Sequence, residues 1–155
     1  TVSPAELATL REAGRTLVLD VGTSAQHVKG HVPGAHWVLR TDLRAVGPEL
    51  PPVDRLVITC ADGRLARLAA WDLQGLVSTP VAALDGGTAA WVAAGLPLEA
   101  GDSNLLSLRI DRYRRPYEGT DAPREAMQAY LDWEFGLVAQ LGRDGTHGFR
   151  VLGAG

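Results

Sequence analysis

The sequence has few of the residues on which several common kinds of site depend. Its 155 residues include one cysteine, Cys60, and Lys29 is the only lysine among 15 basic residues. One cysteine cannot form an internal disulfide, and no cysteine–histidine cluster has the spacing of a zinc site, so we expect no metal. No pattern predicts a cofactor either. A lone thiol fits a reducing compartment best, and we therefore expect a cytoplasmic protein.

The chain also lacks an excess of positive charge and any long apolar run. Its formal net charge is −3 and its pI is about 5.7, which gives no electrostatic case for a nucleic-acid partner. No run approaches the length of a membrane span and no signal peptide is recognisable, so we expect no membrane partner. Because the first residue is Thr1 rather than Met, we expect a piece of a longer polypeptide.

The residues that are present suit a compact α/β domain. Hydrophobic residues make up 46% of the chain and the mean hydropathy is zero. Short apolar runs typical of strands covered on both faces stand at 16–21, 36–39, 56–60 and 81–84. Helical patterns lie between them, and Ser3 with Glu6 reads as a capping box before a helix that runs to about Glu12. This alternation predicts a mainly parallel sheet flanked by helices up to about residue 97.

The last third of the chain differs from the first part. We predict a first domain at 1–100 and a C-terminal extension at 101–155, with an irregular segment and a long helix at about 122–141 that Gly142 ends. Apolar residues recur on one face of that helix: Met127, Tyr130, Leu131, Leu137, Val138 and Leu141. Packing against the first domain is the simplest interpretation of this face. A homodimer, or docking to another domain of a longer parent chain, is the alternative.

The lone cysteine occupies a position that favours chemistry. Cys60 follows the apolar run 55–59, and the chain then turns through Gly63 into a helix. The loop residues that follow the thiol are Ala61, Asp62, Gly63, Arg64, Leu65 and Ala66. Backbone N–H groups in such a turn, together with the positive end of the helix dipole, form a cradle for an anion. The pattern predicts a nucleophilic thiol, whereas a buried structural cysteine is the simpler alternative.

Other residues receive structural interpretations near this loop. We expect Asp20 to cap the turn after the first strand and His31 to bond to backbone in a Gly/Pro turn. Gly86 and Gly87 should let the backbone pass close beneath the cysteine loop. The other histidines, His27, His36 and His147, have no acid or thiol partner at a recognisable spacing, so a cysteine–histidine protease pair is unsupported. Trp71 and Trp91 are interpreted as core.

Three stretches in order resemble the rhodanese-like domains, which are single-cysteine α/β sulfurtransferases. The run 17–21 with 30–35 is similar to a strand ending Asp-Val followed by Gly-His-Ile-Pro-Gly-Ala, and 60–63 is similar to the loop Cys-x-x-Gly. The run 84–97 is similar to Leu-x-Gly-Gly-x-x-x-Trp-x-x-x-Gly-Leu-Pro. The tail looks similar to the C-terminal ends of bacterial tandem-rhodanese proteins. The resemblance thus implies the C-terminal part of such a protein, with a mainly parallel sheet of five strands.

The resemblance also implies an activity. Cys60 would take a sulfane sulfur from a small anionic donor, thiosulfate or 3-mercaptopyruvate, and pass it from a persulfide to a thiol or cyanide. It further implies docking to other rhodanese-like domains as an alternative to a homodimer. The chain departs from the family at Gly22, where relatives often have Arg, and at Gln26, where they often have Glu. Leu65 matches neither donor pattern, so the donor stays open.

Two other functions compete with sulfur transfer. Phosphatases and arsenate reductases of related fold use a Cys-x5-Arg loop, in which the arginine grips a tetrahedral anion. Counting from Cys60 places that arginine at position 66, where this chain has Ala66. The second alternative is a non-catalytic module that binds a partner or relays persulfide from a neighbouring domain. The presence of the cysteine argues against a purely inactive module.

Overall fold

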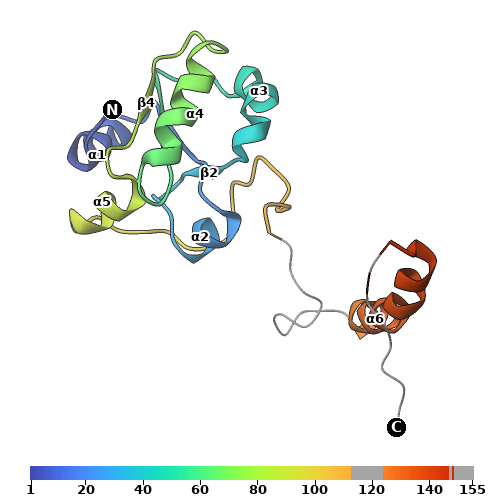
Figure 1. Ribbon diagram of the computed structural model, residues 1–155. Helices are drawn as coiled ribbons and strands as arrows, with labels where there is room; N and C mark the ends of the chain where they lie inside the picture. Colours follow the sequence, from blue (N-terminus) through green and yellow to red (C-terminus); the bar gives the residue numbers. More distant parts are fainter. Residues whose placement is uncertain (113–123, 147, 149–155) are drawn as a thin grey trace. The chain divides into compact units, whose positions relative to one another are not determined.

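The computed structural model describes residues 1–112, 124–146 and 148. The chain divides into two compact units, Thr1–Arg112 and Tyr113–Gly155, each of which is described by itself (Figure 1). The first unit contains a sheet and five α-helices, and the described part of the second is one helix.

The first unit is built on a parallel sheet of four strands. They are β1 (Thr16–Asp20), β2 (His36–Trp37), β3 (Arg55–Thr59) and β4 (Val81–Ala83), in the order β2-β1-β3-β4. All three pairings are parallel, as predicted. The prediction of five strands is wrong for the described residues. The one further segment beside β4 makes a single bridge, from Val2 to Leu84, because Pro4 already begins a helix two residues later.

Helices cover both faces of the sheet, as Figure 1 shows, with α1 and α5 on one side and α3 and α4 on the other. Their bounds are α1 (Pro4–Glu12), α2 (Ser24–Lys29), α3 (Leu43–Val46), α4 (Arg64–Gln74) and α5 (Gly87–Ala93), with short 3₁₀ turns η1 (Arg40–Asp42) and η2 (Gly47–Glu49). Successive strand residues alternate between two cores. Leu56 and Ile58 pack with α3 and α4, and Val57 packs with α1 and α5. Near-continuous apolar strands are what such a two-sided sheet requires.

Local capping signals set the helix starts. Ser3 accepts from the Glu6 amide at 3.2 Å while Glu6 accepts from the Ser3 amide, so the predicted capping box is confirmed. Thr23 and Gln26 form the same reciprocal pair at the start of α2. Each box satisfies backbone donors that a helix leaves unpaired at its start. The second box fixes how the chain leaves β1 and turns into α2.

The residues between α5 and Arg112 form hydrogen bonds with earlier parts of the first unit. Glu99 and His31 exchange two backbone hydrogen bonds at 2.9 Å, and the Leu106 amide donates to the Trp37 carbonyl at 2.8 Å. The Ser24 amide donates to a carboxylate oxygen of Asp111 at 2.7 Å. The contacts therefore continue to the end of the described segment, and the predicted domain boundary at residue 100 stays a prediction.

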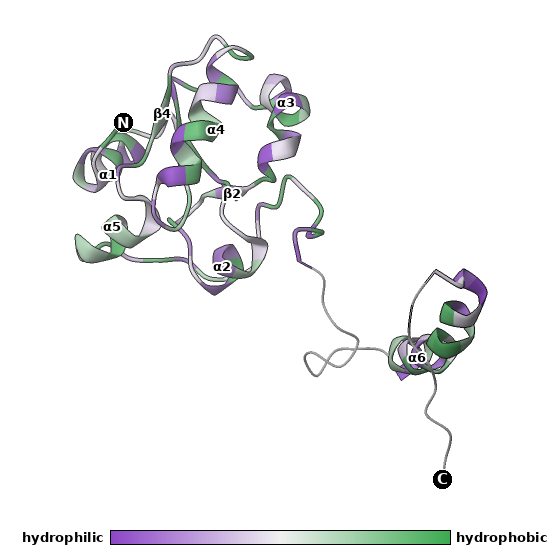
Figure 2. Cartoon of the chain, viewed as in Figure 1, coloured by the Kyte–Doolittle hydropathy of each residue, from purple (hydrophilic) through white to green (hydrophobic). Residues whose placement is uncertain are grey.

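The predicted C-terminal helix is confirmed as α6 (Arg124–Asp144). Its expected start at about 122 lies outside the described residues. The expected stop at Gly142 is wrong, because one glycine costs a helix only about 1 kcal/mol. The helix ends instead at Gly145, whose φ is +65° and whose amide bonds to the Leu141 carbonyl. Figure 2 shows hydrophobic and hydrophilic residues alternating along α6, and none of its residues is buried.

Candidate active site

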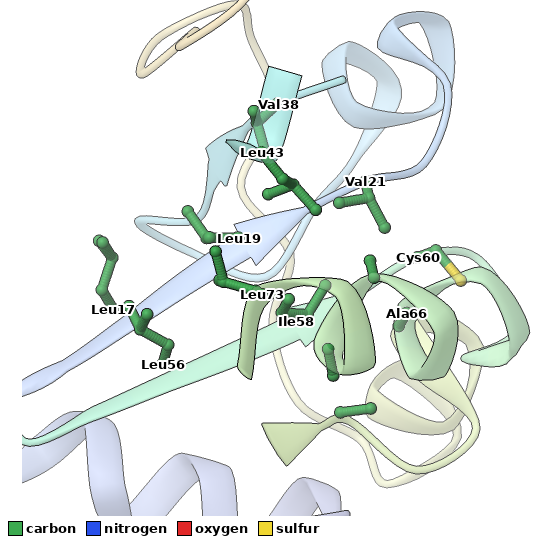
Figure 3. Packing of buried hydrophobic residues seen from close by; sticks show 13 residues of the cluster. Leu17, Leu19, Val21, Val38, Leu43, Leu56, Ile58, Cys60, Ala66 and Leu73 are labelled. Carbon is green, nitrogen blue, oxygen red and sulfur yellow. The ribbon is translucent and has the colours of Figure 1, made fainter. Parts of the chain in front are cut away.

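The lone thiol lies where β3 ends and the chain turns toward α4. Cys60 directly follows the last residue of β3, and 3% of its surface is exposed. It is a free cysteine at the end of the core cluster between the sheet and α4. Figure 3 shows its sulfur pointing toward the loop that enters α4. The carboxyl ends of parallel strands are where ligands bind in open α/β sheets.

The loop after Cys60 carries free backbone donors. Gly63 is the N-cap of α4 and has a φ of +79°, a left-handed conformation that suits glycine. The amides of Ala61, Asp62, Gly63, Leu65 and Ala66 donate no hydrogen bond to a described residue, whereas the Arg67 amide bonds to the Gly63 carbonyl. Free amides at the start of an eleven-residue helix favour an anion there.

Two glycines lie directly beneath this loop. The amide of Thr88 donates to the Cys60 carbonyl, and that of Ala89 to the Ala61 carbonyl, both at 2.9 Å. A Cβ on Gly87 would collide with the Cys60 carbonyl oxygen and the Gly63 amide. A Cβ on Gly86 would meet the Ala90 side chain instead. The start of α5 thus supports the cysteine loop through backbone contacts for which Gly87 leaves room.

The charged loop residues face solvent beside the thiol. An oxygen of Asp62 lies 3.7 Å from the Cys60 sulfur and also accepts the Arg64 amide at 3.0 Å. The Arg64 side chain is 91% exposed, with its Nε 3.5 Å from Asp62. Leu65 is partly exposed, and Ala66 is buried in the core. The loop therefore brings an acid, rather than an arginine, next to the sulfur.

Asp20 is the centre of a buried polar group. One carboxylate oxygen accepts the Gly22 amide at 2.8 Å, and the other lies 2.9 Å from Nδ1 of His27. Sequence spacing predicted no acid partner for His27. That prediction is wrong, because Asp20 is its partner. The turn after β1 folds α2 back so that residues seven apart meet. The His31 ring stacks on His27 at 3.7 Å and bonds through Nδ1 to the His27 carbonyl.

A pocket of about 480 Å³ opens next to the cysteine loop. It is lined by residues from four segments, among them Asp20, Gln26, Lys29, Ala61, Val92 and Leu98. Sequence reasoning missed this pocket, and it also missed Thr88, whose hydroxyl lies 3.3 Å from that of Thr59. The only signal in the sequence is the pair of departures at Gly22 and Gln26, both of which line the pocket.

The remaining candidates lie away from the thiol or outside the described chain. Trp91 is buried and donates to the Pro97 carbonyl, whereas Trp71 is 79% exposed, so its placement in the core is wrong. Nδ1 of His36 has no hydrogen-bond partner in the part of the chain that the structure describes. His147 lies outside that part. No cluster of three potential metal ligands occurs among the described residues.

A comparison with protein families decides the family. The family model of the rhodanese-like domain matches residues 3–94, a range that includes the cysteine loop and the glycine pair Gly86 and Gly87. The chain belongs to the rhodanese-like domain family. Its fold of a parallel sheet between helices is that of the family, and the cysteine-bearing loop lies within the matched range.

Solved structures agree with this assignment. A thiosulfate sulfurtransferase from Pseudomonas aeruginosa matches with 59% identity and a TM-score of 0.91, over 99% of this chain and 29% of that one. A Rhodopseudomonas palustris protein described as a possible tyrosine phosphatase matches with 28% identity and a TM-score of 0.57, over 64% of this chain and 83% of that one. A rhodanese-like domain protein from Staphylococcus aureus shares the fold. It matches with 21% identity and a TM-score of 0.55, over 65% of this chain and 97% of that one.

The first of these relatives is a much longer protein. This rhodanese-like chain spans less than a third of the Pseudomonas sulfurtransferase it matches. None of the described helices combines the length and the apolar character that a membrane span requires.

Proposed function

We propose that this rhodanese-like chain is a sulfurtransferase that carries a sulfane sulfur as a persulfide on Cys60. The observation that carries the proposal is the free thiol at the end of β3, next to five amides at the start of α4 that have no acceptor among the described residues. A persulfide is an anion, and convergent N–H donors stabilise one without any metal ligand. The 59% identity to a thiosulfate sulfurtransferase supports the same activity.

The proposed reaction has two half-reactions. The Cys60 thiolate attacks the outer sulfur of thiosulfate, the sulfur–sulfur bond of the donor breaks, and sulfite leaves with the electron pair. With 3-mercaptopyruvate, the carbon–sulfur bond breaks instead, and the pyruvate carbanion takes a proton. The persulfide then gives its outer sulfur to cyanide or a thiol, and Cys60 leaves as a thiolate. The five free loop amides, those of Ala61, Asp62, Gly63, Leu65 and Ala66, would hold the anionic sulfur in both halves.

The phosphatase alternative finds no support in the loop. Ala66, at the position that a Cys-x5-Arg loop gives to arginine, is buried in the core between the sheet and α4. The side chain of Arg64 is in solvent, and Arg67 pairs with Asp85 at 2.7 Å. The loop therefore brings no guanidinium to a bound tetrahedral anion. A non-catalytic or relay module remains the second candidate, because the site that accepts sulfur from a donor could equally accept it from a neighbouring domain.

A cyanide-dependent thiocyanate assay tests the proposal. Thiosulfate and 3-mercaptopyruvate are supplied in turn to the protein, to Cys60→Ser, and to Arg44→Gln as a control on an exposed residue of α3. We expect thiocyanate from the protein and the control, and none from Cys60→Ser. If the protein and Cys60→Ser are equally inactive with both donors, the catalytic interpretation is lost and a binding or relay role takes its place.

Two further predictions concern the location of the chain and its parent protein. We expect a cytoplasmic protein, and we expect the chain to be the C-terminal part of a tandem-rhodanese protein.

The apolar residues of α6 are the proposed contact with other rhodanese-like domains or with a second copy of the chain. Met127, Leu131 and Val138 are exposed on this helix. Light scattering over a concentration series would detect the second copy as a dimer that Leu131→Asp dissociates.

A further inference from the structure

The pocket beside the cysteine loop is too large for substrates such as cyanide and thiosulfate. Its volume is about 480 Å³, within the range of sites that hold organic molecules of drug size. Cyanide and thiosulfate have few atoms and would leave most of it empty. The pocket lies on this chain's own residues, between α2, the cysteine loop, α5 and the segment that ends at Leu98.

The pocket shares its wall with the sulfur-carrying loop. Ala61, the residue after Cys60, lines it, and so do Thr88 and Ala89, whose amides bond to the carbonyls of Cys60 and Ala61. Ala61 N lies 3.9 Å from the position of a Cβ on Gly22. A molecule in the pocket would therefore lie against Ala61, directly next to the residue that would carry the persulfide.

Gly22 and Gln26 both line the pocket. A Cβ on Gly22 would lie 3.0 Å from Oδ1 of Asp20, 3.6 Å from Oε1 of Gln26 and 3.9 Å from the Ala61 amide nitrogen, so a longer side chain there would take up part of this space. Glycine leaves that side chain out, and glutamine at position 26 adds no negative charge to the lining. The space is left to a ligand, and an anionic group in it meets no repulsion from residue 26.

The lining combines an apolar part with the cation of Lys29. Val92, Leu98 and Ala89 supply apolar surface, and Lys29 forms no ion pair with any described residue. The acid on the lining, Asp20, has one oxygen bonded to the Gly22 amide and the other to His27. A complementary ligand thus has an apolar body and one negative charge placed at Lys29.

We propose that the sulfur acceptor is an organic thiol with an apolar body and a carboxylate, held in this pocket with the carboxylate at Lys29. The inference rests on the proposed function. In the transfer, the acceptor's thiol first loses its proton to solvent, and its thiolate attacks the outer sulfur of the Cys60 persulfide. A new sulfur–sulfur bond forms, the bond to Cys60 breaks, and its electron pair returns to Cys60 as a thiolate. The product is the acceptor's persulfide.

A series of acceptors of increasing length tests the apolar part. The persulfide form is supplied with 3-mercaptopropanoate, 6-mercaptohexanoate or 8-mercaptooctanoate, and kcat/KM is measured for each. Every methylene that becomes buried should raise kcat/KM about two- to fourfold. Val92→Trp, which fills the pocket from an exposed residue, should flatten this dependence, whereas Leu68→Trp on the exposed face of α4 should preserve it. A flat series in the unmodified protein overturns the proposal.

A charge comparison tests the role of Lys29. The unmodified protein should prefer 6-mercaptohexanoate over 6-mercaptohexanol by about threefold, the size typical of an exposed ion pair. Lys29→Gln should remove the preference, and Arg44→Gln should retain it. An equal preference in Lys29→Gln and in the unmodified protein contradicts the assignment of the carboxylate to Lys29.

Failure of this inference is distinguishable from failure of the proposed function. If cyanide takes the sulfur but the thiol series is flat, Cys60 remains a sulfur carrier and the pocket is not the acceptor site. If no sulfur is transferred at all, binding of octanoate, which has no thiol, is followed by NMR at the amides of Ala89 and Val92. Shifts that Val92→Trp abolishes support the pocket as the ligand site, and their absence overturns it.

Discussion

The sulfur of Cys60 lies 3.7 Å from Oδ1 of Asp62, and that oxygen also accepts the Arg64 amide at 3.0 Å. The acid thus stabilises the turn into α4 while it places a negative charge beside the thiol. Thiosulfate and mercaptopyruvate are anions, so this charge opposes the approach of a donor even as the loop amides favour it. Asp62 is more than half exposed, which limits the repulsion through solvent screening.

Asp62→Asn should therefore lower the KM for thiosulfate. Asparagine keeps an oxygen for the Arg64 amide but removes the charge, and a screened interaction at this range corresponds to about a two- to fivefold change. The measurement is steady-state kinetics at low and high salt, with the effect smaller at high salt. Asp54→Asn, an exposed acid paired with Arg15, is the matched control and should leave KM unchanged. A higher KM in Asp62→Asn would contradict the repulsion argument.

Gly87→Ala should destabilise the protein and disable the loop. The new Cβ would meet the Cys60 carbonyl and the Gly63 amide, and φ at this position is +61°. We expect a loss of roughly 3 kcal/mol in the free energy of unfolding, from steric overlap added to left-handed strain. Urea denaturation measures it.

Gly95→Ala separates the two causes. Its φ is +74°, yet nothing lies within 4 Å of a Cβ there, so it should cost only about 1 kcal/mol of strain. Equal losses in the two variants would mean that the contact beneath the cysteine loop adds nothing to stability.

Asp20→Ala should cost about 2–4 kcal/mol in the free energy of unfolding. The change removes the acceptor for the Gly22 amide and leaves buried Nδ1 of His27 unpaired, and each such loss costs about 1–3 kcal/mol. Asp54→Ala, which loses only an exposed ion pair, should cost less than about 1 kcal/mol. A comparable small loss in Asp20→Ala would show that the buried polar group is not a stabilising element.

The contact between Ser24 and Asp111 should weaken in acid. Burial alone would raise the pKa of Asp111, but the hydrogen bonds from Ser24 and the charge of Arg109 outweigh it, and the pKa lies below its ordinary value. A lowered folded-state pKa means that the contact contributes fully above the unfolded pKa of about 4 and is lost as pH falls through the folded value. The protection factor of the Ser24 amide, which is its exchange rate measured by NMR and corrected for the intrinsic slowing of exchange in acid, should fall in that range. The same fall in Asp111→Asn would assign the effect to another group.

The order and type of the elements in the first unit could be predicted from the sequence because each carries a local signal. Apolar runs mark the strands, and the Ser3–Glu6 box marks α1. The fifth strand, by contrast, came from the resemblance, and Pro4 leaves too short a segment for it. Trp71 shows the limit of pattern reasoning, since α4 is amphipathic and the tryptophan lies on its exposed face.

Some features of the candidate site could likewise be predicted from the sequence, and others could not. The cysteine loop is continuous in sequence, so its residues could be named from the sequence alone, from Cys60 to Ala66. The pairing of Asp20 with His27 and the pocket between α2 and α5 depend on how separate segments fold together, and sequence spacing carries no signal for either. The departures at Gly22 and Gln26 are the only sequence features noted that coincide with the pocket.

The intact mass of the protein after incubation with thiosulfate is the sharpest test of Cys60 as a sulfur carrier. We predict a gain of one sulfur atom that resides on Cys60, is absent from Cys60→Ser, and disappears on addition of cyanide as an equal amount of thiocyanate forms. An unchanged mass with both thiosulfate and 3-mercaptopyruvate would contradict the proposed sulfur transfer.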